Sequence, residues 1–109
     1  MTEQQFNEIA KWQKETFEQA TPLSTLTRLL EEIVELKGEL INEKAHPTTT
    51  NFNRVRMEFA DCFILIFGSA AAYGLSFQNI CDAIQEKFEI NKARKWGNPD
   101  ENGVVKHVS

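Results

Sequence analysis

The stretch that most constrains the fold is MEFADCFILIFGSAAAYG, residues 57–74. After Asp61 it contains no charged residue, and its apolar residues occur on every side of the helix that it predicts. This helix, over roughly 53–73 and ended by Gly74, is expected at the centre of an all-α bundle. Its first turns nevertheless carry Glu58 and Asp61, and burying an unpaired carboxylate is costly. Something must therefore compensate these two acids.

Apolar spacing predicts three further helices and no convincing strand. Four helices with short connections predict one antiparallel four-helix bundle in a single domain, residues 1–109. A chain of 109 residues builds only a modest core, and its central helix is apolar all round, so a second subunit is expected to complete the bundle. The other helices are expected over 3–20, 24–44 and 76–95, with Ser24 or Thr25, Asn51 or Asn53, and Ser76 as N-caps.

Charge and composition narrow the class of protein. The net charge is −4 and no basic block stands out, so a surface for a nucleic acid polymer is not favoured. The N-terminus lacks the apolar core of a signal peptide, and the uncharged run after Asp61 is shorter than a membrane span. Cys62 and Cys81 lie within apolar helical patterns and are expected to be reduced core thiols. A cytoplasmic protein without a membrane partner is predicted.

Two pairs of acids share one spacing on neighbouring predicted helices. Glu32 and Glu35 are three residues apart, and so are Glu58 and Asp61, so each pair points from one side of its helix. Antiparallel packing of the two helices would bring the four carboxylates together. Oxygen ligands of this kind suit a hard cation, Mg²⁺ or Mn²⁺.

Two other interpretations of these acids are open. A di-iron carboxylate bundle uses Glu-x-x-His pairs on facing helices, but His46 is expected in a loop and His107 in the tail. Salt bridges would satisfy the acids without a metal, and Glu31 and Glu39 alone would suit a solvated helix face. The basic residues near the acids in sequence are Arg28, Lys37, Arg54 and Arg56.

The predicted fourth helix carries a polar stripe of Lys87, Asn91 and Arg94. These residues flank the apolar face that includes Ile84 and Phe88. The stripe is either a solvated helix edge or a grip for phosphate oxygens. Beside an acidic metal site the second interpretation is preferred, because a nucleoside polyphosphate needs both a bridging cation and cationic side chains.

At these residues the sequence resembles the MazG-like all-α NTP pyrophosphatases. The family's acidic motifs stand here as EEIVE (Glu31 to Glu35) and EFAD (Glu58 to Asp61), followed by KFEINKAR (Lys87 to Arg94). The tail NKARKWGNPDENGVVKHV is similar to a narrower branch, the phage and bacterial dATP/dGTP diphosphohydrolases that include MazZ-like enzymes.

The resemblance implies hydrolysis of a deoxynucleoside triphosphate between the α and β phosphates, with a purine preference. It also implies a homodimer or homotetramer. Two or more Mg²⁺ ions would bind Glu32, Glu35, Glu58 and Asp61. Glu31 or Glu35 would activate the water, with Glu39 as a possible outer acid. Lys87, Asn91 and Arg94 would hold phosphate.

The base would need an aromatic slot, for which Trp12 and Phe17 are candidates, although Phe17 better suits the core. Relatives often have a histidine before the first acidic motif, where this chain reads LTRLLEE, so Arg28 is a further substrate-binding candidate and base choice stays open. Two rival functions are compatible with the sequence: a broad house-cleaning NTP pyrophosphatase for non-canonical nucleotides, and a non-catalytic helical interaction module.

Overall fold

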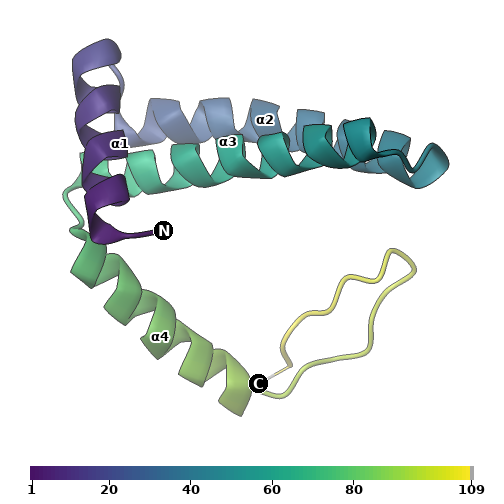
Figure 1. Ribbon diagram of the computed structural model, residues 1–109. Coiled ribbons are helices and arrows are strands. Elements are labelled where there is room, and N and C mark those ends of the chain that lie inside the picture. Colours follow the sequence, from purple (N-terminus) through teal and green to yellow (C-terminus); the bar gives the residue numbers. More distant parts are fainter. Residues whose placement is uncertain (109) are drawn as a thin grey trace. The chain divides into compact units, whose positions relative to one another are not determined.

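The structure is a computed structural model, and it describes residues 1–108 (Figure 1). The all-α class is confirmed, since the described residues contain four helices and no strand beyond an isolated β-bridge. The chain divides into two compact units, residues 1–77 and the part from Gln78 onward, and each is described by itself. The helices are α1 (Glu3–Thr16), α2 (Pro22–Ala45), α3 (Thr49–Tyr73) and α4 (Phe77–Ala93).

Threonines begin the first three helices. Thr2, Thr21 and Thr48 are extended, and each side chain accepts a hydrogen bond from the backbone N–H three residues later. The expected N-caps of α2 and α3 were therefore wrong by several residues. The physical reason in α2 is Pro22, which lies in the first turn, where its missing N–H is not needed.

The helix ends agree with the sequence at Gly74 and differ earlier in the chain. Gly74 has φ 116° and its N–H reaches the carbonyls of Ala70 and Ala71, so it ends α3 as predicted. The first helix was predicted to reach residue 20 but ends at Thr16. The N–H of Phe17 bonds to the carbonyl of Gln13, and the chain then turns.

Helices α2 and α3 form an antiparallel pair, lying side by side and joined by a three-residue loop (Figure 1). Helix α1 packs on α3, where Gly68 leaves room for the side-chain amide of Gln13. The hydroxyl of Ser69 donates to the carbonyl of Pro22 at 2.8 Å, which ties α3 to the start of α2. A bundle that also includes α4 remains a prediction.

Phe6 is the most buried hydrophobic side chain among residues 1–108, at 3% exposure. Its ring lies 6.2 Å from that of Phe67 and 5.7 Å from that of Phe77. We expect Phe6→Ala to lower the free energy of unfolding by about 3–5 kcal/mol, the cost of removing a buried aromatic ring. Urea unfolding followed by circular dichroism measures it. Phe6→Leu, which keeps part of the volume, is the matched control and should lose less; equal losses would contradict the ring packing.

Helix α3 is not enclosed within one copy of the chain. Leu65, Gly68 and Ser69 are buried, but Phe59 and Phe63 are exposed. Neither cysteine is fully buried, and both are free. No single helix in residues 1–108 has the length and apolar composition of a membrane span.

In the second unit, α4 is followed by a short hairpin-like tail. The N–H of Gly97 bonds to the carbonyl of Lys106, and the N–H of Val108 to that of Lys95. At the turn, the Asp100 carboxylate accepts from the backbone N–H groups of Asn102 and Val104. Residues 96–108 thus contain turns and no regular helix.

Candidate functional site

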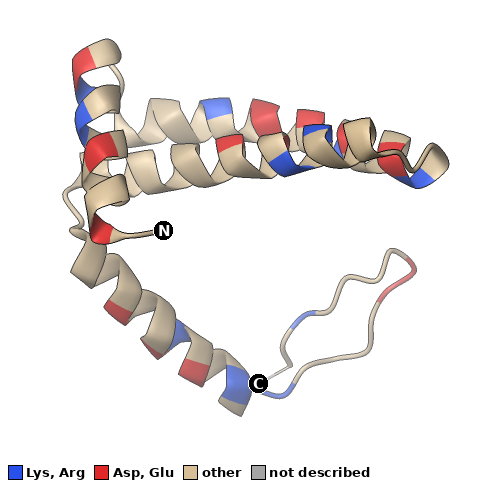
Figure 2. Cartoon of the chain, in the orientation of Figure 1, with Lys and Arg blue, Asp and Glu red and all other residues tan. Residues whose placement is uncertain are grey.

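Three carboxylates from two helices meet on the α2/α3 pair. Glu32 comes from α2, and Glu58 and Asp61 come from α3. One oxygen from each lies within 4.8 Å of the others. Figure 2 shows acidic residues on both helices where they lie side by side. We call these three residues the acid cluster; the predicted convergence is confirmed for them.

Glu35 and Glu39 extend the acid cluster along α2. Glu35 lies within hydrogen-bonding reach of Glu32, and this contact is one of the causes that raise the pKa of Glu32. Glu39 is half-buried, and its Oε2 has no hydrogen-bond partner. Glu31 is exposed and is not part of the three-carboxylate group.

Within the described part of the chain, the arginines and Lys37 do not neutralise the acid cluster. Within residues 1–108, neither an arginine nor Lys37 forms an ion pair with Glu32, Glu35, Glu58 or Asp61. Arg28 instead lies over the ring of Phe17, with its guanidinium carbon 5.9 Å from the ring centre. Glu58 Oε2 is buried without a partner. The salt-bridge interpretation is therefore not supported, and the cluster is a set of hard oxygen donors that fits a divalent cation.

The electrostatics of the acid cluster favour a proton or a cation. Burial raises the pKa of Glu32, and the hydrogen bond and negative charge of Glu35 raise it further. Burial also raises the pKa of Glu58, followed by repulsion from Glu35 and Asp61. Burial raises the pKa of the Cys62 thiol, and the charges of Glu32, Glu58 and Asp61 raise it further. The thiol therefore stays protonated and poorly nucleophilic.

These shifts predict a pH dependence for the metal-free protein. A carboxyl group whose pKa is higher in the folded than in the unfolded chain binds more protons when folded, so stability falls as pH rises. In EDTA, the free energy of unfolding should thus decline as pH rises from the ordinary value of 4.5 through the raised pKa values of Glu32 and Glu58. Urea unfolding at pH 5 and pH 8 measures the decline. Glu58→Gln should make the decline with pH shallower. An unchanged decline would show that the raised pKa of Glu58 does not cause it.

An aromatic pocket lies one helical turn from the acid cluster. The ring of Phe17 is 5.4 Å from that of Trp12, edge to face, and forms the stacking contact with Arg28. Phe17 was expected in the core, but it follows α1 and is 39% exposed. The predicted substrate candidates Trp12 and Arg28 thus both contact Phe17, but only Arg28 lines the pocket beside it. The pocket, of about 140 Å³, is lined by Gln13, Phe17, Ala20, Ser24, Thr25, Arg28 and Leu65.

The pocket and the acid cluster share two helices. Arg28 is four residues before Glu32 on α2, and Leu65 is four residues after Asp61 on α3. Four residues rise about 6 Å along a helix, so the two sites are neighbours. Gln13 lines the pocket, but the sequence did not predict this role. The feature that could have indicated it is a polar amide side chain within the apolar face of the first helix.

The polar stripe belongs to the second unit. Lys87 is exposed and has no ion pair within residues 1–108. Asn91 is half-buried, and its Oδ1 has no hydrogen-bond partner. Arg94 is half-buried and lies 3.5 Å from His107 Nδ1 through its Nη1. The stripe retains unused donors and an unused acceptor, as a ligand site would need.

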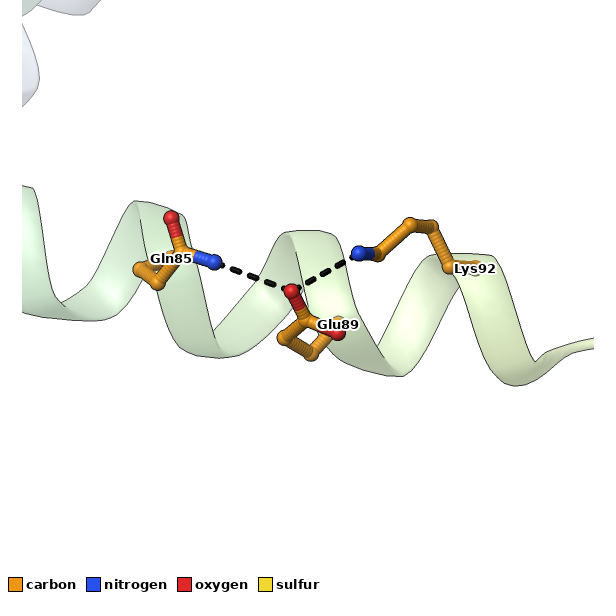
Figure 3. A network of polar contacts seen from close by, with 3 residues as sticks. All are labelled: Gln85, Glu89 and Lys92. Atoms are coloured by element: carbon orange, nitrogen blue, oxygen red, sulfur yellow. Dashed lines mark hydrogen bonds and ion pairs between the residues drawn. The ribbon is translucent and has the colours of Figure 1, made fainter.

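A neighbouring lysine, Lys92, already forms an ion pair within α4. Lys92 Nζ lies 2.8 Å from Glu89 Oε1, which also accepts from Gln85 Nε2 at 3.0 Å (Figure 3). Lys92 also lies over the Phe88 ring, 4.7 Å from its centre. Lys87 and Arg94 are therefore the better candidates for an anionic ligand.

Comparison with known proteins gives the chain a family. A family model described as dATP/dGTP pyrophosphohydrolase matches residues 5–109. The dATP/dGTP diphosphohydrolase of Cyanophage S-2L is 35% identical over 102 residues, which cover 93% of this chain and 82% of that protein. No solved structure matches the chain. The chain is a nucleoside triphosphate pyrophosphohydrolase and belongs to the dATP/dGTP pyrophosphohydrolase family.

Proposed function

We propose that this chain is a MazG-like enzyme of the MazZ-like branch that hydrolyses purine deoxynucleoside triphosphates, dATP or dGTP, in the presence of Mg²⁺. The products are the deoxynucleoside monophosphate and pyrophosphate. The observation that carries the proposal is the acid cluster, whose three oxygens lie within 4.8 Å of one another and form no ion pair with Arg28, Lys37, Arg54 or Arg56. The name of the cyanophage relative supports the choice of substrate.

Mg²⁺, or Mn²⁺ in its place, would be held by the acid cluster together with Glu35. The unpartnered Glu58 Oε2 and the raised pKa values of Glu32 and Glu58 support this, because a cation would relieve the repulsion. Four carboxylates have enough oxygens for two or more ions. When bound, the ions would lower the pKa of a water molecule and offset the charge of the triphosphate.

The chain's own residues would orient and deprotonate the water. The water oxygen would bond to the α phosphorus, the bond from that phosphorus to the oxygen of the leaving pyrophosphate would break, and a carboxylate would take the proton. Sequence left Glu31 and Glu35 as alternatives for this base. Glu35 is better supported, because it contacts Glu32 and lies in the field of Glu58, whereas Glu31 is outside the cluster.

Lys87, Asn91 and Arg94 would hold phosphate oxygens. Their donors are not used by carboxylates within residues 1–108, and Arg offers a fork that matches two phosphate oxygens. We expect Lys87→Ala to raise the KM for the triphosphate about tenfold, the effect of losing one charge-assisted contact. Steady-state kinetics measure it, with Lys11→Ala on α1 as the control; an unchanged KM would contradict the assignment.

The aromatic pocket would receive the base. A purine can stack on Phe17, which lines the pocket, or on Trp12, which packs against Phe17 but does not line the pocket; Arg28 can contact either the base or the sugar. The position of the pocket supports this role, because the pocket adjoins the acid cluster along both α2 and α3.

The enzyme would assemble as a homodimer or homotetramer. Four α2 residues, Leu23, Leu30, Val34 and Ile41, are each between 65% and 75% exposed. They are separated by 7, 4 and 7 residues, and because 18 residues make about five turns, they form one line along the helix. We call this line the α2 stripe. A second copy is its proposed occupant, since one chain buries few hydrophobic side chains among residues 1–108.

Pyrophosphate release from the four common dNTPs, with Mg²⁺ and with EDTA, tests the function. Release from dATP or dGTP alone, abolished by EDTA, is expected. Release from all four, and from oxidised nucleotides, would support the house-cleaning alternative. No release from any nucleotide by folded protein would overturn the proposal and favour an interaction module.

A further inference from the structure

The tail brings a residue from near the C-terminal end of the chain onto the end of the polar stripe. Trp96 and His107 are paired by the β-bridge, and their rings lie edge to face with centres 5.9 Å apart. The indole N–H of Trp96 donates to the carbonyl of Asn91 at 2.9 Å, which fixes the tail to the last turn of α4. His107 is thereby placed beside Arg94, thirteen residues before it.

The contact between these two residues has a defined polarity. A guanidinium has only donors, so Nδ1 of His107 is the acceptor and Arg94 Nη1 is the donor, at 3.5 Å. His107 must then carry its proton on Nε2. One N–H of Arg94 is used by this contact, and other N–H groups of the guanidinium remain for a ligand.

We propose that His107 is a positioning residue that holds the guanidinium of Arg94 ready for the polyphosphate of the substrate. The inference rests on the proposed function, in which Arg94 binds phosphate. A free arginine side chain samples many rotamers, and ordering it costs free energy on binding. A contact that orders Arg94 beforehand lowers this cost, so the tail contributes to substrate affinity without touching the reacting atoms.

Two substitutions separate positioning from packing. His107→Phe keeps a ring against Trp96 but has no acceptor, whereas His107→Asn loses the ring and keeps an oxygen close to the position of Nδ1. At pH 8, we expect His107→Phe to raise the KM for dATP or dGTP about fivefold with kcat little changed, the effect of one lost hydrogen bond. His107→Asn should stay within about twofold of the wild type. Glu101→Gln, in the exposed turn of the tail, is the control.

The opposite ranking would overturn the proposal: an impaired His107→Asn beside a normal His107→Phe would show that the ring only packs. An Arg94→Ala background provides the second test, because His107→Phe should have no further effect there. A full effect in that background would also overturn it.

A binding measurement distinguishes this inference from the proposed function. Calorimetry with a dATP or dGTP analogue that cannot be cleaved between the α and β phosphates reads affinity without turnover. If Arg94→Ala weakens binding and His107→Phe does not, the positioning role fails while the phosphate site stands. If Arg94→Ala leaves binding unchanged, both the phosphate assignment of Arg94 and the role of His107 fail.

Discussion

Asp61→Asn should abolish Mg²⁺-dependent turnover while leaving the protein folded, and it should raise thermal stability in EDTA. Activity should fall by at least about a hundredfold, because the carboxylate is proposed to bind the ion that activates the reaction. Stability should rise because the charge of Asp61 repels Glu32 and Glu58 and raises the pKa of both. A residue that merely holds the fold would lose activity and stability together. A loss of activity together with a gain of stability in EDTA therefore distinguishes a metal ligand from a structural residue.

The measurement combines kcat, the melting temperature in EDTA and the increase in melting temperature on adding Mg²⁺. A ligand that binds only the folded state stabilises it, so the Mg²⁺-induced increase should disappear in Asp61→Asn. Asp82→Asn is the matched control, because Asp82 is exposed and accepts a hydrogen bond from Gln78 that an asparagine oxygen can still accept. A folded Asp61→Asn protein with normal activity would refute the metal assignment.

Local chemistry explains how much of the fold could be predicted. Apolar spacing predicted all four helices, and Gly74 ended α3 because only glycine readily takes φ 116° there. The first residue of each helix was harder to predict, because several residue types can cap a helix. The segment TPLST holds three capping candidates, and the choice of Thr21 depends on Pro22 serving as the first helical residue.

The site could be predicted in part, for a similar reason. Equal spacing in two antiparallel helices was enough to bring Glu32 to Glu58 and Asp61. The same spacing treated Glu35 as an equal member, but side-chain geometry left it beside the trio, bonded to Glu32. Phe17 was misplaced because the sequence did not reveal that α1 stops at Thr16. The contact of His107 with Arg94 joins residues across a turn, which helical periodicity does not describe.

Glutamates placed in the α2 stripe should separate the assembly into single chains. We expect Leu30→Glu/Val34→Glu to elute with the mass of one chain, 12.5 kDa, whereas the wild type elutes at twice that mass or more. Burying two unpaired carboxylates in each copy of an interface costs several kcal/mol, enough to prevent association. Both side chains are mostly exposed within one copy, so the substitutions remove little packing from the chain itself. Size-exclusion chromatography with light scattering measures the mass.

Gln4→Glu/Gln5→Glu is the charge-matched control, since it adds the same charge at exposed polar positions of α1 and should leave the mass unchanged. If single chains do not fold alone, the stripe variant will lose its helical circular dichroism instead. The wild type then provides the independent test, because the melting temperature of an oligomer rises with protein concentration. A wild-type protein that has the mass of one chain and a concentration-independent melting temperature would refute the assembly. The α2 stripe would then be free to bind a different partner.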